Sequence, residues 1–132
     1  MDGQPFTLRM SARPDAVPRA RHELAKIAFG YGVDSFAVKA VVSELVGNVV
    51  KHAYGGSEPG TVVVTARPTE DQLLITVADE GEGIRPRPRD QEVGLGLGLS
   101  LSAQLTEELR MESDERGTTV YASFHIPGRG GA

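Results

Sequence analysis

Two polar side chains lie four residues apart in the stretch 43–54, which reads SELVGNVVKHAY. A helix places residues i and i+4 on the same side, so Glu44 and Asn48 are expected to share one flank. Their oxygen atoms are of the kind that Mg²⁺ prefers, and Glu44 is placed to accept a proton from a reacting group. Lys51 and His52 lie one turn further on. A Glu and an Asn on a helix flank are more often a solvated surface, so this pair alone does not indicate a site.

A second candidate is the acidic residue at the end of a predicted strand. The apolar residues at 73, 75 and 77 alternate along the strand, and Asp79 has the same parity, so its carboxylate is expected to point into the core. Burying a carboxylate without hydrogen-bond donors costs several kcal/mol, so the protein or a ligand must supply donors. Gly81 and Gly83 follow at alternate positions, which allows the backbone to come close to whatever Asp79 holds. The alternative is a tight turn with a partly exposed aspartate.

Two further patterns lie in the C-terminal half. The stretch 94–99, GLGLGL, opens a predicted helix whose apolar side carries Leu101, Leu105 and Leu109. A glycine-rich entry to a helix presents free backbone N–H groups at the positive end of the helix dipole, which suits phosphate. The spacing matches neither GxxxxGK[ST] nor a strand followed by GxGxxG. Thr118 begins the last predicted strand and has the parity that faces the core.

Periodicity and turn signals predict the elements that must position these residues. Asp15 is a favourable N-cap for a first helix ending near 30–32, and Asp34 for a central helix that runs to about Tyr54 and is closed by Gly55 and Gly56. Strands are predicted from alternation at 6–11, 61–66, 73–79, 109–112 and 118–126. The stretch 85–92, RPRPRDQE, is expected to be an extended basic loop.

Composition limits the class of protein. With 132 residues, of which 39% are hydrophobic and 24% charged, the chain fits one globular domain at 1–127 followed by a flexible tail at 128–132. The net charge of −4 disfavours nucleic acid as a partner. The absence of cysteine excludes a disulfide scaffold and thiolate metal sites. Without an apolar N-terminal run or an apolar span of 18 residues, we expect a cytoplasmic protein with no membrane partner.

Four motifs occur in a fixed order: Glu-x-x-x-Asn in a helix, Asp-x-Gly-x-Gly after a strand, Gly-x-Gly opening a helix and Gly-Thr opening a strand. This set resembles the GHKL ATP-binding family, which includes the ATP domains of gyrase, Hsp90-type chaperones and sensor histidine kinases. The stretches SELVGNVVKHAY, VADEGEGI, GLGL and GTTV are most similar to the anti-sigma factor serine kinases of bacterial stress and sporulation control. The resemblance implies an α+β fold: a two-layer α/β sandwich with a mixed, mostly antiparallel sheet and helices on one face.

The same resemblance implies ATP or ADP as the ligand, together with Mg²⁺. Asp79 would accept a hydrogen bond from the adenine amino group, and Thr118 would support the same edge of the base. Asn48 would ligate Mg²⁺, and Glu44 would be the general base. His52 is a weaker candidate near the phosphates. The remaining nucleotide contacts that the family pattern implies fall on Gly81, Gly83, Ile84, Gly96, Leu97, Gly98 and Leu99.

The implied function is that of an ATP-dependent protein serine/threonine kinase. It would phosphorylate a STAS-type anti-sigma antagonist and sequester a sigma factor in stress control, as a homodimer. Arg21 resembles a position by which the family contacts the sigma factor. A short segment before the glycine loop, where 93–95 replace the arginine common in the family, favours a different function: a nucleotide-gated binding module without phosphotransfer. The motifs also fit a switch kinase of the same family and, less well, a severed histidine kinase domain.

Overall fold

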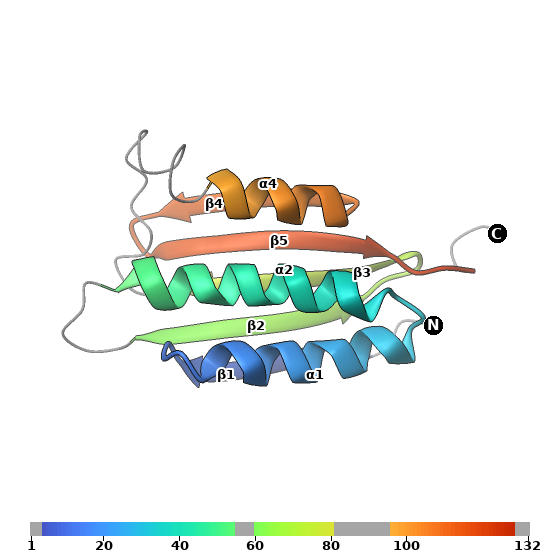
Figure 1. The fold of residues 1–132 in the computed structure, drawn as a ribbon, viewed down its shortest axis with the longest axis horizontal. Helices are drawn as coiled ribbons and strands as arrows, with labels where there is room; N and C mark the ends of the chain where they lie inside the picture. Colours follow the sequence, from blue (N-terminus) through green and yellow to red (C-terminus); the bar gives the residue numbers. More distant parts are fainter. Residues whose placement is uncertain (1–3, 55–59, 81–95, 129–132) are drawn as a thin grey trace.

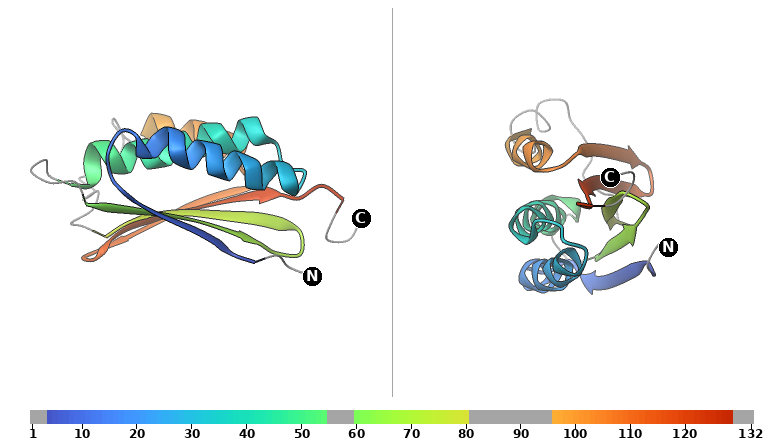
Figure 2. Two further views of the ribbon diagram at one scale, coloured as in Figure 1. Left: turned by 90° about the horizontal axis from the view of Figure 1, so that it is seen from below. Right: turned by 90° about the vertical axis from the view of Figure 1, so that its right-hand side faces the viewer.

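One antiparallel sheet with helices on one face makes up the fold (Figure 1). The computed structural model describes residues 4–54, 60–80 and 96–128, with side chains from 101 onward in the last segment. The strand order is β1-β2-β3-β5-β4, and every pairing between described strands is antiparallel. Figure 2 shows the helices in a single layer against one face of this sheet. The predicted two-layer α+β sandwich is confirmed.

Burial alternates along the strands because their side chains point to opposite faces of the sheet. In β3, the apolar residues at 73, 75 and 77 are buried together with Asp79, and Thr118 is buried in β5, as their parity predicted. The fourth strand is longer than expected, since its pairing with β5 continues to Asp114 and Gly117. The strands are β1 (Phe6–Ser11), β2 (Thr61–Pro68), β3 (Gln72–Asp79), β4 (Glu108–Asp114) and β5 (Gly117–His125).

The helical layer consists of α1 (Ala16–Gly30), α2 (Ser35–Asn48) with a π-helical continuation η1 (Val49–Ala53), and α4 (Gly96–Leu105). Asp34 caps α2 as predicted, because its carboxylate accepts hydrogen bonds from the N–H groups of Phe36 and Ala37 at 2.9 and 3.3 Å. Asp15 stands at the N-cap position of α1, but its side chain makes no cap hydrogen bond. The predicted N-cap position of Asp15 is therefore confirmed, but its side chain does not cap the helix by a hydrogen bond.

The expected apolar side of the third helix also needs correction. Helix α4 ends at Leu105, Leu101 is 52% exposed, and Leu109 lies in β4. Just after the helix, the Thr106 hydroxyl donates to the carbonyl of Ser102 at 3.0 Å. The following residue already pairs with the sheet, since the amide of Glu107 donates to the carbonyl of Ser123 at 2.8 Å.

The core lies between the layers, with α2 at its centre. Its largest fully buried side chains come from α2, from the inner positions of β2 and β3, from α1, and from Ile126, which follows β5. In the part of the chain that the structure describes, no helix has both the length and the apolar character needed to span a membrane. The predicted closure of the central helix at Gly55 and Gly56, the loop at 85–92 and all but the first residue of the tail at 128–132 lie outside the described residues.

Candidate functional site

The helical part of the candidate site is the end of α2. Asn48 is the last residue of α2 and is only 8% exposed, while Glu44, one turn earlier, is half-buried. The chain then continues into η1, where a π-helical turn contains one more residue than an α-helical turn. This places Val49 and Ala53 in the core and leaves His52 exposed to solvent. π-Helical turns of this kind are frequent at functional sites.

The sheet part of the candidate site is the place where β3 ends beside the start of β5. Asp79 is 4% exposed, and its Oδ1 accepts a hydrogen bond from the backbone N–H of Thr118 at 3.4 Å. Thr118 is 2% exposed, and its hydroxyl is 2.9 Å from that of Ser113. A Cβ atom on Gly117 would collide with the carbonyl oxygen of Asp79, and the φ angle of Gly117 is 143°. The Gly-Thr motif therefore lets β5 approach Asp79 closely.

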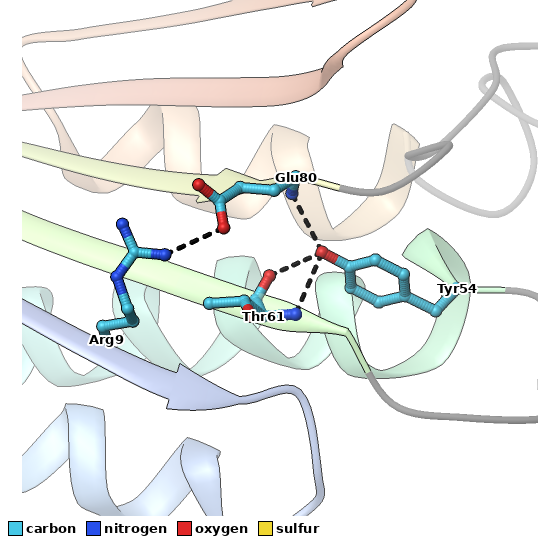
Figure 3. Close-up of polar contacts among 4 residues, drawn as sticks. All are labelled: Arg9, Tyr54, Thr61 and Glu80. Atoms are coloured by element: carbon cyan, nitrogen blue, oxygen red, sulfur yellow. Dashed lines mark hydrogen bonds and ion pairs between the residues drawn. The ribbon is translucent and has the colours of Figure 1, made fainter.

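Tyr54, which directly follows η1, was not among the predicted site residues. Its hydroxyl donates to the carbonyl of Thr61 at 2.6 Å and accepts from the N–H of Glu80 at 2.9 Å (Figure 3). The N–H of Thr61 also donates to it, at 3.2 Å. Beside this group, Arg9 and Glu80 form an ion pair at 2.9 Å, but both side chains are more than half exposed, so the pair adds little stability.

The segments that carry the predicted residues meet at one end of the molecule. Figure 1 places the end of α2 and η1, the end of β3, the start of β5 and the start of α4 at the same edge. Contacts join η1 to β3 and α2 to α4. The backbone of Gly96, Leu97, Gly98 and Leu99 forms the first turn of α4, so part of the glycine-rich stretch opens a helix as predicted. Gly81, Gly83 and Ile84 lie outside the described residues.

Sequence comparison identifies the family. The model of the histidine kinase-like ATPase domain matches residues 10–124, which is most of the chain. The chain belongs to the histidine kinase-like ATPase domain family. This confirms the resemblance that the four motifs indicated.

Named relatives of this ATPase domain are bacterial kinases. Serine-protein kinase RsbW of Listeria innocua is 38% identical over 79 residues, covering 58% of this chain and 50% of that protein. RsbW of Oceanobacillus iheyensis is 35% identical over 78 residues, covering 57% and 49%. The chain thus spans about half the length of the curated relatives it matches.

A solved structure shows the same fold. The crystal structure of the RsbU and RsbW domains of a Mycobacterium tuberculosis protein matches this ATPase domain with a TM-score of 0.70 and 24% identity. The match covers 96% of this chain and 34% of that one.

The residues of this ATPase domain fit a nucleotide and its metal. A buried carboxylate at a strand end, Asp79, is an acceptor suited to an amino group on a flat base. Asn48 offers an amide oxygen near a helix end. Among the described residues, no three His, Cys, Asp or Glu side chains gather into a metal-binding group. A metal held here would therefore take most of its ligands from phosphate and water, with the Asn48 amide oxygen as a protein ligand, which is how Mg²⁺ usually binds with nucleotides.

A hollow of about 410 Å³ opens near the same edge of the sheet. Its lining includes Asp79 and Gly117 of the candidate site, together with Glu112, Arg116 and Tyr121. The Tyr121 hydroxyl donates to Glu112 at 3.1 Å, and this hydrogen bond to a carboxylate raises the pKa of the phenol. Tyr121 has the parity opposite to the buried Thr118, so it lies on the face of the sheet away from the helices, and Asn48 is not among the residues that line the hollow.

Proposed function

We propose that this ATPase domain binds ATP with Mg²⁺ and transfers the γ-phosphoryl group to a serine or threonine of a STAS-type antagonist protein. The observation that supports this most is the buried carboxylate of Asp79, which lies at the same end of the fold as Asn48. The names of the RsbW relatives support the same reaction class.

Each predicted residue has a defined role in this proposal. Asp79 accepts a hydrogen bond from the adenine amino group, and Thr118 supports the same edge of the base. Asn48 donates an oxygen ligand to Mg²⁺, which when bound neutralises phosphate charge. His52 is exposed and is a weaker candidate near the phosphates. Backbone groups of Gly81, Gly83, Ile84 and the 96–99 turn complete the nucleotide contacts.

Glu44 is the general base in this proposal. It takes the proton from the attacking hydroxyl while that oxygen forms a bond to the γ-phosphorus. The bond between the γ-phosphorus and its bridging oxygen breaks, and ADP leaves with that oxygen. Glu44 is half-buried on the same side of α2 as Asn48, which places the base beside the proposed metal ligand.

Control of a sigma factor belongs to the same proposal. The domain sequesters a sigma factor as a homodimer in the cytoplasm, as part of a stress response, and phosphorylation of the antagonist controls this sequestration. Arg21 is exposed on α1, and its guanidinium lies 3.5 Å from the Ser43 hydroxyl of α2. This position leaves one side of the guanidinium available to a protein partner.

Substituting Asp79 tests nucleotide binding. In Asp79→Asn, an amide N–H replaces an acceptor opposite the adenine amino group, so we expect Mg-ATP affinity to fall about 10- to 100-fold by calorimetry. Asp71→Asn, in the exposed turn between β2 and β3, is the matched control and should bind as the unsubstituted domain does. An Asp79→Asn protein with unchanged affinity would refute the assignment of the base site.

Substituting Glu44 tests phosphotransfer. We expect Glu44→Ala to bind Mg-ATP within about twofold of the unsubstituted domain, yet to transfer phosphate to a STAS-domain protein at least about 100-fold more slowly. Glu70→Ala, at an exposed turn, serves as the control. If the unsubstituted domain binds ATP but labels no STAS-domain partner, the nucleotide-gated binding module becomes the better explanation.

A further inference from the structure

The pairing between β2 and β3 stops one position earlier than its register allows. Val62 lies opposite Asp79 and Val63 opposite Ala78, so the next pair in the register is Thr61 with Glu80. This pair is absent from the ladder of the described strands. The Tyr54 hydroxyl lies between the two instead, accepting from the Glu80 N–H and donating to the Thr61 carbonyl (Figure 3).

The ring of Tyr54 is held in place by a glycine. A Cβ atom built on Gly60 would overlap the Tyr54 ring, so the ring lies directly over the Gly60 backbone. Gly60 is not one of the described glycines that have a positive φ angle. The glycine is therefore explained by the space that the ring needs and not by an unusual backbone angle.

We propose that Tyr54 is a positioning residue that sets the separation between the two halves of the nucleotide site. It follows η1, the continuation of the helix that carries Glu44 and Asn48, and it binds the backbone of Glu80, which follows Asp79. A ligand that reaches from Asp79 to Asn48 depends on this separation. Binding groups must lie within about 0.5 Å of their productive positions, so a small change in the separation should weaken such a ligand. This inference rests on the proposed function, because it assigns the two ends to base and phosphates.

A purely structural role for Tyr54 predicts something different. If the hydroxyl only stabilised the fold, its removal would lower stability and weaken every ligand equally. A positioning role predicts selective loss. Adenosine occupies only the Asp79 half of the proposed site, whereas Mg-ATP must contact both halves at once. Only Mg-ATP then depends on the separation that Tyr54 sets.

Calorimetry on Tyr54→Phe tests the selective loss. The variant keeps the ring over Gly60 and removes only the hydroxyl. We expect Mg-ATP affinity to fall about 5- to 20-fold, with adenosine affinity within about twofold of the unsubstituted domain. Tyr121→Phe is the matched control, since it removes a hydroxyl from the face of the sheet opposite to the buried Thr118 and should change neither affinity. Equal losses for both ligands, or no loss, would overturn the positioning role.

A mutant cycle with Gly60 provides a second route that leaves the hydroxyl intact. Gly60→Ala should displace the ring and reproduce the selective loss of Mg-ATP affinity. In a Tyr54→Ala background, Gly60→Ala should add nothing, because the ring that it displaces is gone. If Gly60→Ala and Tyr54→Ala lower Mg-ATP affinity independently and additively, the contact between the Tyr54 ring and Gly60 is not the cause of the loss.

Hydrogen exchange separates this inference from the proposed function. In the domain without nucleotide, the amides of Glu80 and Thr61 donate to the Tyr54 hydroxyl, so Tyr54→Phe should speed their exchange about tenfold or more. If the unsubstituted domain binds no adenine nucleotide while Tyr54→Phe exchanges faster, the proposed function fails but the hydrogen bonds of Tyr54 are supported. Unchanged exchange of both amides would overturn the role of Tyr54 whatever the ligand is.

Discussion

At the scale of single residues, the candidate site depends on how closely the backbone can approach Asp79. Its carboxylate is buried at a strand end, where the N–H of Thr118 reaches it at 3.4 Å. That approach is possible because Gly117 has no side chain to collide with the Asp79 backbone. A buried acceptor beside a close backbone suits a flat ligand that brings its own donor.

The glycine at 117 gives a prediction on stability. Gly117→Ala places a side chain on a residue with a φ angle of 143° and against the Asp79 carbonyl. We expect the free energy of unfolding to fall by about 2–4 kcal/mol, measured by urea denaturation, with loss of nucleotide affinity. Gly47→Ala is the control: its Cβ meets nothing within 4 Å, and alanine in a helix should raise stability by about 0.5–1 kcal/mol. Equal effects of the two changes would contradict the steric explanation.

The direction of Asp79 was predictable from sequence, whereas the role of Tyr54 was not. A strand alternates strictly, so three apolar neighbours were enough to fix the side to which Asp79 points. The Tyr54 hydroxyl bonds to Thr61 and to Glu80, which is 26 residues away, and no local pattern encodes such a meeting. The one available signal was Gly60, a glycine just before a strand.

At the scale of elements, α2 is the part that connects the core to the site. It is buried along most of its length, its N-terminus is capped by Asp34, and its C-terminus changes into η1. Periodicity predicted the whole helical stretch to about Tyr54, and the helical turns reach Ala53. Periodicity did not predict the π-helical turn, which contains one more residue than an α-helical turn. This turn contacts β3, and a local sequence pattern does not report such a contact. Sequence placed Asp15 correctly at the N-cap position but could not show that its side chain makes no cap hydrogen bond. The assignment of Leu109 to the third helix was wrong, because local periodicity does not report the pairing of β4 with β5.

The two aspartates at helix starts allow a matched comparison. Asp34→Ala removes two cap hydrogen bonds at α2, so we expect the free energy of unfolding to fall by about 1 kcal/mol. Asp15→Ala removes a carboxylate that makes no cap hydrogen bond at α1, and its effect should stay below about 0.5 kcal/mol. Urea denaturation of both variants measures the difference. Losses of the same size would mean that the cap hydrogen bonds of Asp34 add nothing to stability.

At the scale of the whole molecule, the site is assembled from parts that are distant in sequence. The helical layer supplies Glu44 and Asn48, and the sheet supplies Asp79 and Thr118 from neighbouring strands. These parts meet only when the two layers are packed together (Figure 1). A ligand that contacts both layers therefore binds the folded chain and not the unfolded one, so its binding must raise the stability of the entire domain.

This linkage gives a prediction for nucleotide and metal together. At a Mg-ATP concentration about 100 times its Kd, the free energy of unfolding should rise by about 2.7 kcal/mol, which corresponds to a Tm increase of roughly 10 °C for a domain of this size. Removing Mg²⁺ with EDTA at constant ATP should reduce this increase, since phosphate charge is then left without its cation. Asn48→Ala should show a smaller difference in Tm with and without Mg²⁺ at constant ATP, because the proposed protein ligand of the metal is gone. Calorimetric scans measure the Tm in each state, with the nucleotide-free domain as the reference. A Tm that is unchanged by Mg-ATP in the unsubstituted domain would contradict a site that spans the two layers.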